Sequence, residues 1–147
     1  AQLARLRDAR NHAHHTNDGL IFTLDAHPVD INTSQSIFKW KSSHTIDVLL
    51  RAHDGEWRAC AQDGSHAVEL RAVGRHAVHV VHNDVAAEGA IVECACTLED
   101  ATLTLFPLKQ RIDKAAANTV RTIERTLVSI AEQLTIDELL EFAAASE

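Results

Sequence analysis

The chain lacks methionine and tyrosine altogether, and aromatic residues make up only 4% of its 147 residues. Because a natural full-length product starts with methionine, we expect the chain to be a fragment cut from a longer protein. The shortage of aromatic residues argues against a non-catalytic module that stacks nucleic-acid bases on its strands. No apolar run approaches the roughly 20 residues of a membrane-spanning helix, and no signal-peptide pattern opens the chain, so we expect no membrane partner.

Basic residues are also scarce, since 14 lysines and arginines stand against 21 aspartates and glutamates, for a net charge of −7. This balance argues against a broad basic surface for nucleic acid, so any contact with RNA should depend on a few basic residues. The three cysteines do not suggest a disulfide framework. Cys94 and Cys96 are two residues apart in an apolar stretch and should share one face of a strand as reduced core thiols.

Two regions differ in their hydrophobic pattern. Residues 1 to about 43 contain two predicted strands, 20–23 and 37–41, separated by a turn-rich stretch. From His44 the pattern changes to short strands with tight turns at Asp54-Gly55 and Asp63-Gly64. These strands are predicted at residues 45–50, 57–60, 67–70, 78–81, 90–96 and 102–105. The series predicts a small closed barrel of the OB type, although an SH3-like barrel would have nearly the same pattern.

The end of the chain is predicted to be helical. An apolar stripe at three- and four-residue spacing indicates an amphipathic helix that packs against the barrel; it consists of Val120, Ile123, Leu127, Ile130 and Leu134. Asn118 is the expected N-cap of this helix. Thr135 and Glu138 have the spacing of a capping box for a final short helix. The predicted fold class is therefore mainly β, with C-terminal helices.

Two short basic strings are candidates for binding phosphate. In Lys39-Trp40-Lys41, strand alternation places both ammonium groups on one face, with Phe38 and Trp40 on the other. Two like charges at this distance favour an anion between them, although a solvated edge strand protected by lysines has the same pattern. In Arg111-Ile112-Asp113-Lys114, Arg111 offers a planar fork and Lys114 a point charge, with Asp113 able to orient either. Taken alone, this string also has the composition of a solvated charge run.

The order of the strings is more specific than any one of them. Asp18-Gly19-Leu20-Ile21-Phe22-Thr23 is followed by Phe-Lys-Trp-Lys at 38–41, Thr-Ile-Asp at 45–47, Ile-Val-Glu-Cys at 91–94 and Arg-x-Asp-Lys at 111–114. In this order, from about residue 17 to 140, the chain resembles the mRNA guanylyltransferase (mRNA capping enzyme) family. The resemblance implies that residues 1–43 are the C-terminal remnant of a nucleotidyltransferase domain. It likewise implies that residues 44–147 are an OB-fold domain with C-terminal helices.

The resemblance also implies a two-step reaction. A lysine attacks the α-phosphate of GTP, and the GMP then passes from the lysine to the diphosphate 5′ end of RNA. Lys39 and Lys41 match the lysines that hold the α-phosphate, and Asp18 matches the acidic residue that places Mg²⁺ (or Mn²⁺). Arg111, Asp113 and Lys114 match the motif that closes over the β- and γ-phosphates. The expected partners are GTP, the RNA 5′ end and the upstream part of the nucleotidyltransferase domain.

Three departures from the family pattern limit this interpretation. The chain contains no Lys-x-Asp-Gly motif, so the nucleophilic lysine is expected outside it and the chain alone is expected to be inactive. Lys109 replaces a common arginine, and Ala117 replaces a common proline. The alternatives are an ATP-dependent polynucleotide ligase fragment or a non-catalytic OB-fold binding module. The expected location is intracellular: the nucleus for a cellular enzyme, and the cytoplasm or virion for a viral one.

Overall fold

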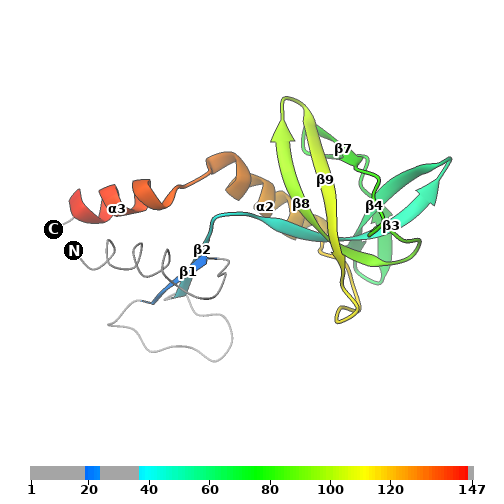
Figure 1. The fold of residues 1–147 in the computed structure, drawn as a ribbon, viewed down its shortest axis with the longest axis horizontal. Coiled ribbons are helices and arrows are strands. Elements are labelled where there is room, and N and C mark those ends of the chain that lie inside the picture. Colours follow the sequence, from blue (N-terminus) through cyan, green and yellow to red (C-terminus); the bar gives the residue numbers. More distant parts are fainter. Residues whose placement is uncertain (1–18, 24–36, 146–147) are drawn as a thin grey trace. The chain divides into compact units, whose positions relative to one another are not determined.

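A computed structural model describes residues 19–23 and 37–145 (Figure 1). The described residues divide into two compact units. One unit is residues 44–133, and the other contains residues 19–23, 37–43 and 134–145. These units are defined by contacts between residues. The predicted domains, 1–43 and 44–147, are based on the family resemblance and stay a prediction.

The unit of residues 44–133 is built on one curled seven-stranded sheet. Its strands are β3 (Thr45–His53), β4 (Glu56–Asp63), β5 (His66–Glu69), β6 (Ala72–Val73), β7 (His76–Val80), β8 (Ile91–Glu99) and β9 (Thr102–Gln110). They lie in the order β5-β4-β3-β8-β9-β7-β6, and every pair is antiparallel except β7 with β9, which is parallel. Each predicted strand of this region is therefore present, most of them longer than predicted.

The two edges of the sheet follow each other directly in the chain, which curls the sheet into a barrel. Strand β5 ends one edge and β6 the other, and only Leu70 and Arg71 separate them. At this junction the Leu70 amide donates to the Ala59 carbonyl of β4 at 2.8 Å, and the Val78 amide of β7 donates to the Arg71 carbonyl at 3.1 Å. The predicted OB-fold is confirmed: the sheet is a partly open Greek-key barrel followed by a helix (Figure 1).

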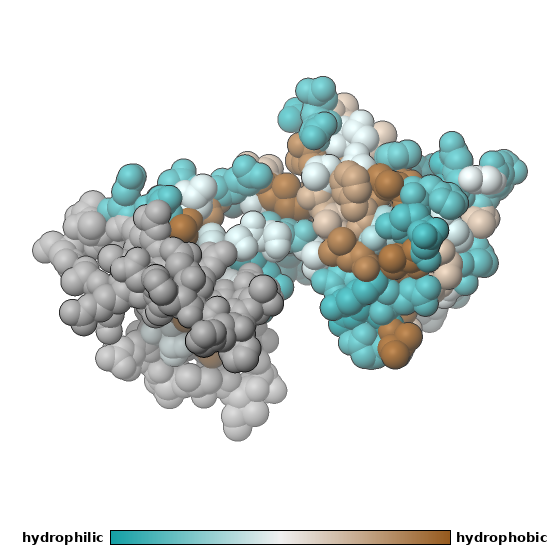
Figure 2. All heavy atoms as spheres, in the orientation of Figure 1, coloured by the Kyte–Doolittle hydropathy of each residue, from teal (hydrophilic) through white to brown (hydrophobic). Residues whose placement is uncertain are grey.

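Strand alternation and one helix face fill the barrel core. Ile46, Val48 and Leu50 of β3 are at most 1% exposed, and burial of such side chains contributes roughly 1.5–3 kcal/mol each. Helix α2 (Val120–Glu132) adds the buried side chains of Ile123, Leu127 and Ile130. Figure 2 shows polar residues over much of the visible surface, with hydrophobic residues exposed at separate points among them. The burial of Ile123, Leu127 and Ile130 confirms the central part of the amphipathic stripe predicted for this helix.

Both ends of α2 differ from the prediction by a residue or more. The N-cap is Thr119, whose hydroxyl accepts a hydrogen bond from the Thr122 amide at 3.2 Å, so the expected cap at Asn118 is wrong. The helix ends at Glu132, and its C-cap Gln133 adopts the left-handed conformation with φ of 36°. Leu134 lies beyond that end and is 53% exposed, so it does not belong to the buried stripe. Residue spacing in the sequence could not show whether the helix begins after Asn118 or Thr119, or whether it includes Leu134, because all these positions fit the same helical pattern.

The other unit contains a hairpin and a helix. Strands β1 (Gly19–Thr23) and β2 (Ile37–Lys41) pair antiparallel, with Gly19 opposite Lys41. A Cβ atom at Gly19 would lie 1.9 Å from the Trp40 carbonyl oxygen, so only glycine allows the strands to approach this closely. Helix α3 (Ile136–Ala145) starts with the predicted capping box: the Thr135 amide donates to Glu138 at 2.7 Å and the Glu138 amide donates to the Thr135 hydroxyl at 3.2 Å.

Among the described residues, no helix has the length and apolar character needed to cross a membrane.

Candidate functional site

A buried carboxylate lies beneath the Arg-x-Asp-Lys string. Asp47 occupies the position of β3 between Ile46 and Val48, so its side chain points to the outer face of the sheet while theirs fill the core. It is nevertheless only 6% exposed. The segment from Arg111 to Asn118 returns over this face and covers Asp47, which forms hydrogen bonds with Arg111, Lys114 and Asn118. A buried charge of this kind is stable only with partners.

Arg111 bridges two carboxylates that face each other across the sheet. Asp47 of β3 is directly opposite Glu93 of β8, an arrangement in which like charges repel. The Arg111 Nη1 atom lies 3.0 Å from Asp47 Oδ1 and 3.4 Å from Glu93 Oε2, so the two carboxylates share this guanidinium. The Arg111 amide also donates to the Ile91 carbonyl at 2.7 Å. The arginine is thus held by its backbone and its side chain together.

The remaining edge of the Arg111 guanidinium is bound by Asp113. Nε donates to Oδ1 at 2.9 Å and Nη2 donates to Oδ2 at 2.8 Å, which is the bidentate geometry that a phosphate group would also accept. The Asp113 side chain is 63% exposed, against 8% for Asp47. Of the carboxylates on Arg111, Asp113 is the one that solvent or another anion reaches first.

Lys114 places a second cation on the same buried carboxylate. Its ammonium group donates to Asp47 Oδ2, and its side chain is 34% exposed. Lys109 of β9 lies opposite Glu93 and contacts Glu93 Oε2 at 3.1 Å, while the Thr45 hydroxyl donates to Glu93 Oε1 at 2.9 Å. Three carboxylates and three cations therefore form one cluster, which we call the Asp47 cluster: Asp47, Glu93, Asp113, Lys109, Arg111 and Lys114.

Asn118 fixes the chain that carries these cations. The pairing of β3 with β4 stops at Leu49–Cys60, and Asn118 enters where Asp47 would otherwise pair with Gln62. Its side-chain oxygen accepts from the Asp47 amide at 2.7 Å, its own amide donates to the Asp47 carbonyl at 2.8 Å, and its carbonyl accepts from the Gln62 amide at 2.9 Å. Asn118 therefore continues the sheet between two diverging strands instead of capping α2.

The charges of the Asp47 cluster shift its pKa values. The hydrogen bonds from Arg111 lower the pKa of Asp113 to about 2. Burial raises the pKa of Glu93, but hydrogen bonds from Lys109 and Thr45 and the nearby charges outweigh it, so the net direction is downward. The hydrogen bond to Asp113 and the charges of the neighbouring carboxylates raise the pKa of Arg111. At neutral pH these three members are ionised.

The other predicted basic string lies on β2 in the other unit. Lys39 and Lys41 are two positions apart on the strand and so share one face, as predicted from alternation. Between them, the Trp40 indole donates from Nε1 to the Leu134 carbonyl at 2.7 Å, which anchors the opposite face. The chain has four lysines. Two of them, Lys39 and Lys41, lie on β2, and the other two, Lys109 and Lys114, belong to the Asp47 cluster. The predicted metal-binding residue, Asp18, lies outside the described residues.

Sequence reasoning overlooked Asp47 and Glu93 as site residues. Both belong to the strings at 45–47 and 91–94, but neither was assigned a role. The available signal was a carboxylate inside an apolar strand, which needs a partner wherever the strand is covered. The structure therefore joins Arg111, Asp113 and Lys114 through residues that are up to 67 positions away in the sequence.

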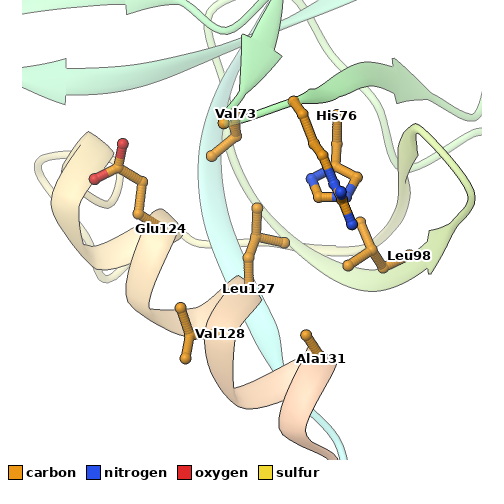
Figure 3. Close-up of a pocket in the computed structure, with 9 residues that line it drawn as sticks. Val73, His76, Leu98, Glu124, Leu127, Val128 and Ala131 are labelled. Carbon is orange, nitrogen blue, oxygen red and sulfur yellow. The ribbon is translucent and has the colours of Figure 1, made fainter.

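A pocket of about 390 Å³ elsewhere on the barrel unit includes none of these residues. It lies between α2 and the β6–β7 hairpin (Figure 3). Val73 and Leu98 face Leu127 and Val128 across it, so its walls are mainly apolar. In the described part of the chain, no group of three or more His, Cys, Asp or Glu residues is placed to hold a metal ion.

If Asp113 moves off Arg111, the Asp47 cluster offers a guanidinium edge and an ammonium group to an anion at the surface. The buried Asp47 carboxylate holds the Arg111 and Lys114 side chains next to each other. Because their orientation is set before a ligand arrives, less conformational entropy is lost when one binds. A family model described as mRNA capping enzyme, C-terminal domain, matches residues 22–140, which include both basic strings and the whole barrel. The chain therefore belongs to the family of the mRNA capping enzyme C-terminal domain.

Proposed function

We propose that this chain is the phosphate-handling part of a GTP:RNA guanylyltransferase. The observation that carries the proposal is the pairing of Arg111 and Lys114 on the buried carboxylate of Asp47. A planar fork and an ammonium group held together in this way suit the oxygen atoms of a polyphosphate. The match to the capping-enzyme family supplies the reaction class.

The proposed reaction has two displacements at one phosphorus atom. In the first, a lysine amine outside this chain attacks the α-phosphate of GTP, forms a phosphoamide bond and releases pyrophosphate. In the second, the terminal phosphate oxygen of a 5′-diphosphate RNA attacks the same phosphorus, and the lysine leaves with a proton. The products of the second step are capped RNA and the free lysine.

Lys39 and Lys41 are proposed to act on the α-phosphate. They lie on one face of β2, and Trp40 anchors the other face through its bond to Leu134. Two ammonium groups aimed at one phosphate neutralise the charge that builds up on its oxygen atoms in the transition state. They therefore serve both displacements, because the same phosphorus reacts in each.

Arg111 and Lys114 are proposed to hold the β- and γ-phosphates, with Asp113 orienting the arginine. Asp113 occupies the bidentate edge of Arg111 and is the most exposed of the three carboxylates on it. A phosphate can replace it there with the same two-bond geometry, while Asp47 keeps the guanidinium and ammonium groups in place. Because pyrophosphate leaves in the first displacement, these residues act mainly in that step.

A divalent cation, Mg²⁺ or Mn²⁺, is part of the proposal. When bound, it would neutralise phosphate charge beside the attacking lysine. Asp18 is the proposed residue of this chain that places it. Asp47 and Glu93 do not fit this role, because their oxygens already accept from Arg111, Lys114, Lys109 and Thr45. The proposed enzyme works in the nucleus if cellular, and in the cytoplasm or virion if viral.

The deciding experiment uses the protein that carries this chain together with its upstream lysine. It is incubated with Mg²⁺ and either α-labelled GTP or α-labelled ATP, and the covalent adduct is read on a denaturing gel. We expect a protein–GMP adduct that acid cleaves and alkali preserves, as a phosphoamide requires. A protein–AMP adduct without protein–GMP would instead identify a polynucleotide ligase, and no adduct with either nucleotide would contradict both.

A further inference from the structure

A second pocket on the barrel, of about 370 Å³, is polar and shares no residue with the Asp47 cluster. It lies where β4 extends past its partner β5, because their pairing begins only at Cys60–Glu69. Its walls come from β4, the end of β3, the β5–β6 junction and β7, and consist of His53, Trp57, Arg58, Ala59, Glu69, Leu70, Arg71 and Val78. The pocket therefore lies beside the β3–β4 turn at one end of the barrel, and the mouths of barrels commonly take ligands.

An aromatic platform forms one wall of this pocket. Trp57 is partly exposed and packs against the barrel core, and its ring centre lies 6.2 Å from that of His82 with the planes tilted by 38°. Trp57 is one of only two tryptophans in a chain that is poor in aromatic residues. A rigid ring held by the core presents a flat surface that loses little entropy when another ring stacks on it.

The polar side chains of the pocket offer more hydrogen-bond donors than acceptors. The Trp57 Nε1 and Arg58 Nε atoms are buried and have no hydrogen-bond partner among the described residues. Buried donors in native proteins nearly always have an acceptor. Because strand alternation turns these two side chains to opposite faces of β4, each would take its own acceptor from a bound water or ligand. Nitrogen-bound hydrogens of this kind fit phosphate oxygens and base carbonyl groups.

Arginines and carboxylates lie together at this pocket. Arg51 of β3 is directly opposite Arg58 of β4, a pair that repels unless an anion lies near it. Glu56 contacts Arg58 Nη2 at 2.9 Å, which leaves Arg51 without compensation from that carboxylate. Arg71 touches Glu69 only at 3.4 Å, and its side chain is 84% exposed. Arg71 is therefore the cation of this pocket that an anionic ligand reaches most readily.

We propose that this pocket binds single-stranded RNA, with a base on the Trp57 ring and an adjoining phosphate on Arg58 and Arg71. An isolated inorganic anion would use the arginines and leave the ring without a role, whereas a nucleotide uses both. A duplex would keep its bases stacked and unavailable to the ring. The inference rests on the proposed function, since it assigns a contact to the RNA that accepts the guanylate, at nucleotides beyond its reacting end.

The test measures binding of a fluorescently labelled 5′-hydroxyl oligoribonucleotide by anisotropy, using the full chain. A 5′-hydroxyl end cannot accept guanylate, so the readout does not depend on catalysis. Arg71→Ala is the main variant because its exposed side chain can be removed without disturbing the core, and we expect it to raise Kd about tenfold. Trp57→Leu removes the ring and should have a similar effect. Arg125→Ala on α2, the matched control, should change Kd less than twofold.

Several outcomes would overturn the proposal. These are no binding of the oligoribonucleotide, equal loss in Arg71→Ala and Arg125→Ala, equal affinity for the duplex of the same sequence, or full displacement by inorganic phosphate alone. Guanylate adduct formation is measured in parallel in the protein that includes the upstream lysine. A normal adduct with no effect of Arg71→Ala on RNA binding refutes the pocket alone. Pocket-dependent RNA binding without any adduct refutes the guanylyltransferase and supports the pocket.

Discussion

Asp47 and Arg111 are 64 residues apart in the sequence, yet Asp47 Oδ1 accepts a hydrogen bond from Arg111 Nη1 at 3.0 Å on the outer face of the barrel. Asp47 is covered by the chain that carries Arg111, so each residue depends on the other for its position. The contact links the fold to the proposed chemistry, because the same carboxylate also holds Lys114.

The first prediction concerns the charge of Asp47. Asp47→Asn keeps the shape of the side chain but leaves Arg111 and Lys114 without their buried counter-charge. We expect a loss of about 2–3 kcal/mol in the free energy of unfolding, measured with urea, because breaking a buried ion pair leaves uncompensated charge. Asp84→Asn, at an exposed position, is the control and should cost less than about 0.5 kcal/mol. Equal losses in the two variants would show that Asp47 does not organise the cluster.

The second prediction separates the two proposed chemical steps. In the protein with its upstream lysine, Arg111→Ala and Lys114→Ala should lower the rate of adduct formation with GTP by 100-fold or more, since each removes a charge-stabilising donor. Transfer of GMP from a preformed adduct to RNA should fall much less, because pyrophosphate has already left. Arg121→Ala on α2 is the control for loss of one positive charge. Equal loss in both steps would contradict a role confined to the triphosphate.

The third prediction uses the chain's few lysines as reporters. Lys109 has a side chain that is 65% exposed, whereas the Lys114 side chain is 34% exposed and held by Asp47. An amine-reactive acetylating reagent followed by mass spectrometry should therefore modify Lys109 faster than Lys114. Asp47→Asn should speed modification of Lys114 and leave Lys109 nearly unchanged. If Lys114 reacts at the same rate in both proteins, the ion pair with Asp47 does not persist in solution.

The fourth prediction is a pH dependence with a defined sign. Arg111 lowers the pKa of Asp113 to about 2 from an ordinary value of 3.8, so this carboxylate stabilises the fold above pH 3.8 and the contribution disappears as the pH falls through about 2. An NMR titration of the Asp113 carboxyl should show this midpoint. In Arg111→Gln the pKa of Asp113 should rise toward 3.8. An unchanged midpoint in that variant would exclude Arg111 as the cause.

The fifth prediction concerns the β1–β2 hairpin. Gly19→Ala places a Cβ atom 1.9 Å from the Trp40 carbonyl oxygen, so the strands must move apart. We expect the amides of β2 to lose most of their protection from hydrogen exchange. Gly55→Ala is the matched control, since Gly55 has a φ of 80° but open space around its Cβ position, and it should cost only about 1 kcal/mol in the barrel unit. Undisturbed β2 amides in Gly19→Ala would contradict the close approach.

Local patterns in the sequence predicted most of the secondary structure. Alternation and turn residues predict six of the seven strands of the barrel, all but the two-residue β6, and the Thr135–Glu138 capping box is present as predicted. These features depend on residues two to four positions apart, which is the range over which strand and helix periodicity acts. The same local range explains the error at Asn118, because a polar residue just before a helix fits a cap equally well whether or not its side chain has another partner.

The sequence by itself thus determined most of the strands, the helices, the basic strings and the family resemblance that their order carries. Only the tertiary structure decided that Asp47 and Glu93 lie under Arg111 and Lys114, and that Asn118 joins β3 to β4. The physical reason is that charges and hydrogen-bonding groups act through space. Which groups become partners depends on how the barrel curls and on where the chain after β9 returns over it. A short stretch of sequence does not contain these distant contacts.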